Sequence, residues 1–314
     1  MDFRHPLQKP AYMRWLPSKT TATIASMEFI SRGVMQGFIA GRHKSPHKGF
    51  SIEFAEHRQY TPGDDLRNLD WHVLARSDRS YIKQYVEETN LRATILVDTS
   101  GSMKYRGDAA AAVENAPCSK LEYAQYLAAI LSYLFIGQQD AVGLVTFDTA
   151  IRTYIPARAR ASQVRALLEA LDATKPGGET AIADIFHDIA ERIPRRGLVI
   201  IISDLFDDPE RIVNALHHFR HRRHEVIVLH VLADEELTFP FDQFTRFRNL
   251  EGVSDIQTDP KALRASYLEQ IRLFLQAIKN GCGRIGADYV AMNTATPFDQ
   301  ALSAYLTRRR TGQG

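Results

Sequence analysis

Residues 93–102 read ATILVDTSGS, and this stretch decides the fold that the sequence predicts. Its first five residues are apolar or β-branched, and polar residues follow directly after Val97. A second run, Leu198–Ile202, is equally short and apolar, and it is bounded by Gly197 and Ser203. Such runs are typical of strands that are covered on both faces of a sheet.

Further strands and helices alternate along the chain on either side of these two runs. We expect strands at Ala93–Val97, Ala141–Phe147, Ile151–Ile155 (an edge strand), Leu198–Ile202, Val226–Val231 and Tyr289–Met292. We expect helices at Lys120–Ile136, Ser162–Leu171 (with Ser162 as N-cap), Ala181–Arg192, Pro209–Arg222, Pro260–Gly281 and Phe298–Arg309. Strands alternating with helices predict right-handed crossovers. The fold class is therefore α/β, with a doubly wound, mainly parallel sheet.

The chain is expected to have three parts. Residues 1–40 form an N-terminal segment that is flexible or helical near Ala22–Gly33, and residues 41–92 form a small β-rich element. Residues 93–310 form the α/β domain. The β-rich element has strands at Phe50–Phe54 and Tyr81–Tyr85, with a turn between them. We expect Trp71 to be a core anchor, while the role of the Gly49–Trp71 segment stays open.

Composition restricts the partners and the compartment. Among 314 residues, 39 Lys and Arg against 37 Asp and Glu leave a net charge of +2, which gives no reason to expect a nucleic-acid partner. The two cysteines, Cys118 and Cys282, are far apart, so a disulfide framework and a structural zinc site are not expected. No apolar stretch approaches the roughly 20 residues that cross a bilayer. We therefore expect a cytoplasmic protein without a membrane span.

A candidate metal site follows from the positions of five oxygen-bearing side chains. Asp98, Ser100 and Ser102 come from the loop after the first α/β strand, and Asp204 follows Leu198–Ile202; the fifth, Thr180, lies in PGGET (residues 176–180). Ligands of open α/β sheets bind at the carboxyl ends of the strands. Hydroxyl and carboxylate oxygens suit Mg²⁺, Mn²⁺ or Ca²⁺. Two carboxylates leave such a cation under-neutralised, so the site invites an aspartate or glutamate from another protein.

These five residues resemble the metal-ion-dependent adhesion site of a von Willebrand factor A domain. In that family the serines and the threonine approach the metal, and the two aspartates bind it directly or through water. More specific features resemble a bacterial family of unknown function, the MoxR-associated von Willebrand factor A proteins, over roughly residues 45–310. These features are GFSIEF (49–54), YTPGDD (60–65), Asp70-Trp71, Ala75-Arg76, Asp259-Pro260, Tyr267, Ala287-Asp288-Tyr289 and the stretch Pro297–Arg308.

The resemblance implies a von Willebrand factor A-like, Rossmann-like domain without catalytic residues. It also implies a partner, a MoxR-type AAA+ ATPase, and a chaperone-like role in assembling or activating client complexes. The client would be bound through an acidic side chain at the metal. None of this follows from composition or spacing.

A metal-dependent phosphoester hydrolase is the alternative function. Asp98 ends a strand as the nucleophile of a haloacid dehalogenase-type phosphatase does, but Ser100 stands where that family has a second aspartate. No histidine lies in the motif loops to act as a base, and the chain has neither a G-x-S-x-G elbow nor a G-x-x-x-x-G-K-[ST] loop. We therefore expect a binding protein and not an enzyme.

Overall fold

The computed structural model describes residues 11–16, 52–61, 69–77, 80–87, 91–109, 118–178, 182–194, 196–251 and 255–310. The chain divides into two compact units. One comprises residues 38–90, and the other comprises residues 91–314 together with residues 1–37. No helix within the described ranges combines the length and the apolar character needed to cross a membrane.

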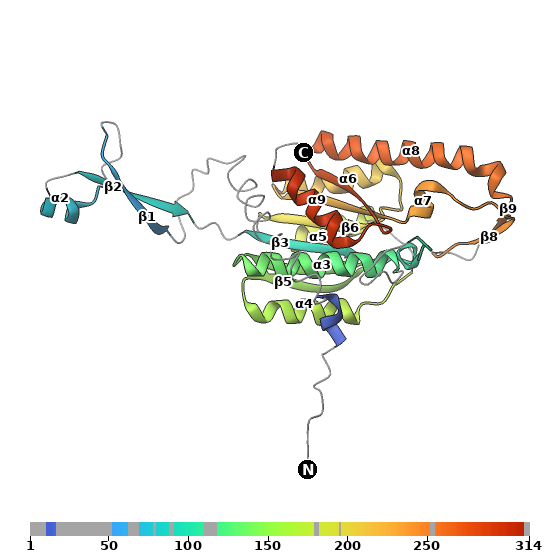
Figure 1. Ribbon diagram of the computed structural model, residues 1–314, viewed down its shortest axis with the longest axis horizontal. Coiled ribbons are helices and arrows are strands. Elements are labelled where there is room, and N and C mark those ends of the chain that lie inside the picture. The colour runs from blue at the N-terminus through green and yellow to red at the C-terminus, as the bar shows by residue number, and fades with distance from the viewer. Residues whose placement is uncertain are drawn as a thin grey trace, which may run out of the picture. The chain divides into compact units, whose positions relative to one another are not determined.

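A six-stranded sheet forms the centre of the larger unit (Figure 1). Its strands, in spatial order, are β10 (Asp288–Asn293), β7 (Glu225–Leu232), β6 (Leu198–Ser203), β3 (Arg92–Asp98), β4 (Ala141–Phe147) and β5 (Ile151–Arg158). All neighbours are parallel except β5, which runs antiparallel to β4 at the edge. The mainly parallel α/β sheet predicted from the sequence is confirmed.

The strand order reverses between β3 and β6. From β3 the chain passes outward to β4 and β5, and it then returns to the other side of β3 to add β6, β7 and β10. Val97 of β3 pairs with Ile202 of β6, so the two strands end side by side. The crevice beyond such a reversal is where open α/β sheets bind ligands. The fold therefore places Asp98 and Asp204 at its expected binding position.

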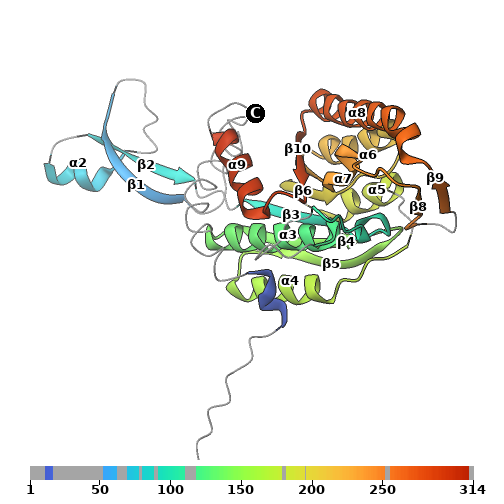
Figure 2. The ribbon, with the colours of Figure 1, turned by 45° about the vertical axis from the view of Figure 1, so that its right-hand side comes forward.

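Helices cover both faces of the sheet (Figures 1 and 2). One layer contains α3 (Lys120–Gly137), α4 (Ala161–Ala173) and α9 (Phe298–Arg310), and the other contains α5 (Ile182–Arg192), α6 (Pro209–His221) and α8 (Pro260–Ile285). The second layer closes over a continuous apolar core. Its largest members include Phe147 of β4, Phe186 of α5 and Phe219 of α6, whose rings meet edge to face.

The starts of three helices have identifiable local causes. Ser119 caps α3 and forms a reciprocal capping box with Glu122, while Asp208 caps α6, which begins with Pro209. The predicted cap of α4, Ser162, is wrong, because the helix begins at Ala161 and no side chain caps it. Its first turn is instead fixed by Gln163, whose amide donates to the carbonyl oxygens of Val142 and Pro156.

Helix α8 continues past Gly281, where the sequence predicted its end. A β-carbon at Gly281 would overlap the side chain of Val213, so this glycine permits close packing of α8 on α6. The helix ends at Ile285, and Gly286 follows with a left-handed φ of 68°. Glycine in this conformation is a common helix terminator.

Two short elements of the larger unit were not predicted. One is α7 (Asp234–Thr238), and the other is a hairpin of β8 (Thr245–Arg248) and β9 (Asp255–Thr258). Phe239, Phe247 and Tyr267 form stacked and tilted ring contacts that attach the hairpin to α7 and α8. Both elements are too short to show a periodic pattern in the sequence.

The smaller unit is a two-stranded antiparallel sheet with one helix. Strand β1 (Ile52–Gln59) pairs with β2 (Tyr81–Glu87), so both predicted strands are confirmed within the described residues. Helix α2 (Trp71–Ser77) was not predicted. Trp71 opens this helix with 62% of its surface exposed, so the core-anchor assignment is wrong. Among the described residues of this unit, Leu69, Asp70 and Ile82 are buried.

The first 40 residues are described only in part. A 3₁₀ turn, η1 (Ala11–Trp15), packs on α3 and α4 of the larger unit, and the Trp15 ring lies 4.9 Å from that of Tyr126. The helix predicted near Ala22–Gly33 and the turn between β1 and α2 (residues 62–68) lie outside the described residues.

Candidate functional site

Asp98, at the end of β3, is the centre of the site. Its carboxylate is fully buried, and its two oxygens accept different hydrogen bonds. The Ser203 hydroxyl at the end of β6 donates to Oδ2 over 2.5 Å, and the Ser100 backbone N–H donates to Oδ1 over 2.8 Å. The Asp98 side chain is thus held where the strand order reverses, by one hydrogen bond from the end of β6 and one from its own loop.

The loop after β3 brings two hydroxyl groups together beside Asp98. Ser100 Oγ and Ser102 Oγ are 3.0 Å apart and both side chains are buried. The Gly101 N–H between them donates to the Gly178 carbonyl over 2.6 Å, which holds the loop in place. The predicted effect of the D-x-S-x-S spacing is therefore seen, because the side-chain oxygens of Asp98, Ser100 and Ser102 lie in one short loop.

Asp204 approaches the same crevice from β6 and carries an incomplete set of partners. Its Oδ2 lies 2.6 Å from Nζ of Lys120, the first residue of α3, and both side chains are only 3% exposed. The same ammonium lies 2.7 Å from Oε1 of Glu236 in α7. The other oxygen, Asp204 Oδ1, is buried and has no hydrogen-bond partner in the described part of the chain.

The pKa values of these groups show an excess of negative charge. Burial, and then the charge of Asp204, raise the pKa of Asp98 to about 7, although hydrogen bonds from Ser203 and Ser100 oppose the rise. Burial acts to lower the pKa of Lys120, but Asp204 and Glu236 raise it above its ordinary value. The ammonium of Lys120 therefore pairs with two carboxylates, those of Asp204 and Glu236, and the negative charge of Asp204 still acts on Asp98.

The chemistry of this donor set fits a hard divalent cation. The donors are two carboxylates and two hydroxyls, and Asp204 Oδ1 is an acceptor that lacks a donor. No cluster of three or more His, Cys, Asp or Glu side chains suited to a metal ion occurs among the described residues. A cation held here by Asp98 and Asp204 would thus depend on the serines, water and an external oxygen ligand.

Thr180, the fifth predicted ligand, lies outside the described residues, and its assignment stays a prediction. Gly177 and Gly178, a short way before it, are described and contact the site loop. The Gly177 N–H donates to the Thr99 carbonyl over 2.5 Å, and the Gly178 carbonyl accepts the Gly101 N–H.

Glu251 is a site residue that the sequence analysis missed. Its Oε1 accepts a hydrogen bond from the Ser102 backbone N–H over 3.2 Å, across 149 positions of sequence. The segment between β8 and β9 lies so close to the loop that a β-carbon at Gly101 would stand 2.5 Å from the Leu250 carbonyl oxygen. An acidic side chain of the chain itself therefore lies at the entrance to the site. No motif surrounds Glu251, so no local pattern indicates this contact.

His230 of β7, also missed, supports Asp204 from behind. Its Nε2 lies 2.8 Å from the Asp204 carbonyl oxygen, which can only accept, so Nε2 carries the proton and Nδ1 accepts from the Tyr289 hydroxyl. Burial lowers the pKa of His230 to about 4. This histidine is neutral near pH 7 and both of its ring nitrogens are occupied, so it braces the backbone. His230 lies within an apolar strand, so its sequence position did not indicate this role.

The residues after Asp204 expose an aromatic ring beside the site. Leu205 is fully buried and has a φ of 49°, a left-handed conformation that is rare for an aliphatic residue. The Ser203 hydroxyl accepts the Leu205 N–H over 2.9 Å and supports this turn. Phe206 follows with 68% of its surface exposed. The backbone is therefore held in an unfavourable conformation that presents an aromatic ring to solvent.

Comparison with known proteins identifies the family. The family model described as "Protein of unknown function DUF58" matches residues 56–273. Uncharacterised proteins of Mycobacterium tuberculosis and Mycobacterium bovis are each 26% identical over 303 residues, covering 94% of this chain and 91% of theirs.

Solved structures with a similar fold include two from Bacteroides. The conserved hypothetical protein BatB from Bacteroides thetaiotaomicron has a TM-score of 0.44 and 22% identity, with 70% of this chain and 99% of that chain covered. An aerotolerance-related membrane protein from Bacteroides fragilis has a TM-score of 0.44 and 19% identity, covering 71% and 99%.

These findings correct the family resemblance drawn from the sequence. The assignment to the MoxR-associated von Willebrand factor A family is wrong, because the family whose model matches the chain is that of unknown function DUF58. Its description names neither a von Willebrand factor A domain nor a metal-ion-dependent adhesion site. The resemblance rested on the site loop and on short segments between residues 49 and 308, and such local features specify geometry better than ancestry.

Proposed function

The chain belongs to the DUF58 family of proteins of unknown function, and we propose that it is a non-catalytic adaptor which docks an acidic side chain of a partner protein through a divalent cation. The cation is Mg²⁺ or, from the same donor set, Mn²⁺ or Ca²⁺. The observation that carries this proposal is the buried Asp204 Oδ1, which has no hydrogen-bond partner among the described residues and lies in the same crevice as the buried carboxylate of Asp98.

A cation would account for both the repulsion between Asp98 and Asp204 and the missing partner of Asp204 Oδ1. Asp98 and Asp204 repel each other, which contributes to the raised pKa of Asp98, and Lys120 neutralises only part of their charge. A divalent ion between them would keep Asp98 ionised and would give Asp204 Oδ1 a ligand. Ser100 and Ser102 would add neutral oxygens. Because protein carboxylates are few, a coordination position is left for an oxygen from outside.

Glu251 supports the choice of an acidic partner group. Its carboxylate already lies against the Ser102 N–H at the entrance, so this entrance accommodates a carboxylate. In the proposed cycle Glu251 covers the crevice when no partner is bound, and the partner's aspartate or glutamate displaces it. The buried state of Asp98 and Ser100 is consistent with such a covered site.

Phe206 supports a protein as the partner. Exposed aromatic side chains next to a polar centre are typical anchors of protein–protein interfaces. Phe206 is two residues from Asp204, and Leu250, which is 37% exposed, adjoins Glu251 on the loop that contacts Gly101. A docked protein could cover both apolar side chains while its acidic residue enters the crevice.

The alternative, a metal-dependent phosphoester hydrolase, has no specific observation in its favour. His230 is the histidine bonded to Asp204 in the described structure, and it braces the backbone with both nitrogens. The pairing with a MoxR-type AAA+ ATPase, the chaperone-like role and the cytoplasmic location stay predictions from the sequence. The partner is defined here only by its acidic side chain.

A pull-down from native cell extract tests the proposal. Tagged wild-type protein, Asp98→Asn and the surface control Asp242→Asn are compared with Mg²⁺ and with EDTA, and bound proteins are identified by mass spectrometry. We expect a partner that the wild type and D242N retain only with Mg²⁺ and that D98N does not retain. Retention that EDTA leaves unchanged would contradict a metal-dependent adaptor. Absence of any partner, with Mg²⁺-dependent phosphoester turnover, would favour the hydrolase.

Phe206→Ala separates the protein contact from the metal. This variant should lose most of the partner while its Mg²⁺ affinity equals that of the wild type. Equal retention of the partner by F206A would remove Phe206 from the proposed interface.

A further inference from the structure

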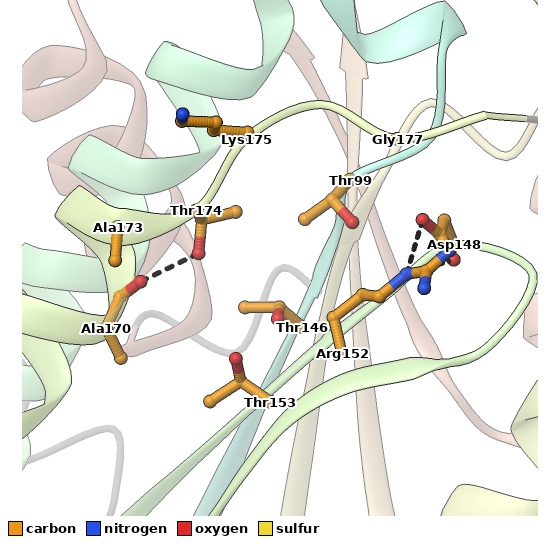
Figure 3. A pocket seen from close by; sticks show the side chains of 10 residues that line it. All are labelled: Thr99, Thr146, Asp148, Arg152, Thr153, Ala170, Ala173, Thr174, Lys175 and Gly177. Carbon is orange, nitrogen blue, oxygen red and sulfur yellow. Dashed lines mark hydrogen bonds and ion pairs between the residues drawn. The ribbon is translucent and has the colours of Figure 1, made fainter.

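A second polar cavity lies on the other side of the site loop, and Figure 3 shows its lining. It has a volume of about 280 Å³. Its walls are the ends of β3 and β4, the start of β5, the end of α4 and the loop that follows α4. Small-molecule sites begin at roughly this size. The four candidate metal ligands that the structure describes, Asp98, Ser100, Ser102 and Asp204, do not line it.

Four of the ten residues that line this cavity are threonines. Thr146 of β4 and Thr153 of β5 pair across the antiparallel strands, so their side chains lie on the same face of the sheet. Thr99 and Thr174 are satisfied, because their hydroxyls donate to the carbonyls of Phe147 and Ala170. The Thr146 hydroxyl is different, since it is buried and has no hydrogen-bond partner among the described residues. A buried, unpartnered hydroxyl in the lining of a polar cavity is a group that a ligand can satisfy.

Positive charge lies at one wall. In Figure 3 Arg152 extends along Asp148 on the side opposite Ala170 and Ala173 of α4. Arg152 Nε lies 2.8 Å and 2.7 Å from the two carboxylate oxygens of Asp148, so the ion pair uses this nitrogen and the terminal guanidinium nitrogens remain donors. The guanidinium side chain is 54% exposed.

Lys175 and Gly177 complete the lining, and in Figure 3 Lys175 lies beside Ala173 and Thr174, across the cavity from Arg152. Lys175, at the edge of the cavity, forms no ion pair with a described residue, so the lining carries a formal charge of +1 after Arg152 and Asp148 cancel. A β-carbon at Gly177 would overlap the Asp148 carboxylate, so glycine is what allows the loop to close over the ion pair.

We propose that this cavity binds a small hydroxylated organic phosphate, with the size of a sugar phosphate or glycerol phosphate. The phosphate lies at the wall of Arg152, because guanidinium donors recognise its oxygens, and Lys175 on the other side makes the net charge of the lining positive. The hydroxyl end lies toward Thr146 and the end of α4, where helix carbonyls accept hydrogen bonds and disfavour an anion. This site is independent of the cation, although both share the loop at Thr99.

Calorimetric titration at low ionic strength tests the proposal, with EDTA present so that the candidate cation site cannot contribute. The probes are glucose 6-phosphate, ribose 5-phosphate and glycerol 3-phosphate, with inorganic phosphate and glucose as partial ligands. We expect at least one organic phosphate to bind tenfold or more tightly than inorganic phosphate, and glucose not to bind. No heat from any organic phosphate, or equal affinity for inorganic phosphate, would overturn the assignment.

Two variants locate the binding. Thr146→Val removes the unpartnered hydroxyl without changing the shape of the side chain, and Lys175→Ala removes the charge at the edge. Each should weaken the bound organic phosphate at least fivefold, while Lys261→Ala, an exposed lysine on α8, should not change it. The melting temperature of T146V should equal or exceed that of the wild type, so lost binding would not reflect unfolding. Unchanged affinity in both variants would place the ligand elsewhere.

Discussion

Lys120 Nζ lies 2.6 Å from Asp204 Oδ2, although the residues are 84 positions apart and both side chains are almost fully buried. The contact joins the start of α3 to the end of β6, and Glu236 of α7 completes it. One lysine thus connects three segments around the crevice.

Replacing Lys120 by methionine should destabilise the protein strongly. The change leaves the carboxylates of Asp204 and Glu236 without their ammonium, and breaking a buried ion pair on one side costs about 3–5 kcal/mol. Urea unfolding measures the loss, with Lys261→Met on the exposed face of α8 as the matched control. A loss below about 1 kcal/mol, the value typical of a surface ion pair, would show that the pair is not buried in solution.

Replacing Glu251 by glutamine should strengthen binding of an acidic partner. Glu251 covers the entrance through its contact with the Ser102 N–H, and a neutral amide competes less well for a cation. If the covered form dominates, the apparent affinity should rise by about threefold to tenfold, because a larger fraction of the protein is competent to bind. Biolayer interferometry with the partner recovered in Mg²⁺ measures the change, and Glu269→Gln on the surface of α8 is the control. Weaker binding by E251Q would make Glu251 a supporting residue instead of a competitor.

Asp140 should make the protein more stable in mild acid than at neutral pH. Burial raises its pKa from 3.8 to about 6, although the Leu91 N–H donates to it and opposes the rise. Between pH 4 and 6 the folded protein therefore binds more protons than the unfolded chain, so this contribution falls as pH rises. Two pKa units correspond to roughly 3 kcal/mol at most.

The variant Asp140→Asn isolates this contribution. Asparagine retains an oxygen that accepts the Leu91 N–H but cannot ionise. D140N should be more stable than the wild type at pH 8 and about equally stable at pH 4, as measured by denaturant unfolding at both values. If the unfolding free energies of the wild type and D140N changed equally with pH, the raised pKa of Asp140 would be contradicted.

The packing of α6 on α8 should depend on Gly281. A methyl group there would meet Val213, so Gly281→Ala should cost about 1–3 kcal/mol despite the better helix propensity of alanine. Adding Val213→Ala makes room for the methyl group. The double variant should therefore lose less unfolding free energy than the two single variants lose in sum. Additive effects in thermal unfolding would show that the two residues do not touch.

The sequence predicted the sheet well because its central strands β3, β4, β6 and β7 are buried on both faces. Leu198–Ile202 contains no polar residue and Ala93–Val97 contains only Thr94, and such runs leave few alternatives to a covered strand. The two runs also placed Asp98 and Asp204 at strand ends, where a parallel sheet brings them together. The parts that were missed are short or exposed: α7, the β8–β9 hairpin and α2 each lack a period long enough to detect.

The rest of the site depends on tertiary contacts that no local pattern records. Lys120 begins a helix 22 positions after Asp98, and Glu251 arrives from a hairpin 149 positions after Ser102. His230 is a polar residue within an apolar strand, which by itself indicates only a satisfied buried group. The family assignment failed for a related reason, since the site loop and the short segments that resembled another family specify local geometry and not ancestry.

The binding of a divalent cation at Asp98 is the central claim, and calorimetric titration of MgCl₂ into wild type and Asp98→Asn tests it most directly. Asparagine matches the shape of Asp98 but removes a buried charge beside Asp204, so D98N should fold at least as stably as the wild type without metal. We predict one Mg²⁺ site in the wild type and at least tenfold weaker binding in D98N, a difference of about 1.4 kcal/mol. Equal Mg²⁺ affinity in the two proteins, or no binding of Mg²⁺, Mn²⁺ or Ca²⁺ by the wild type, would contradict the account.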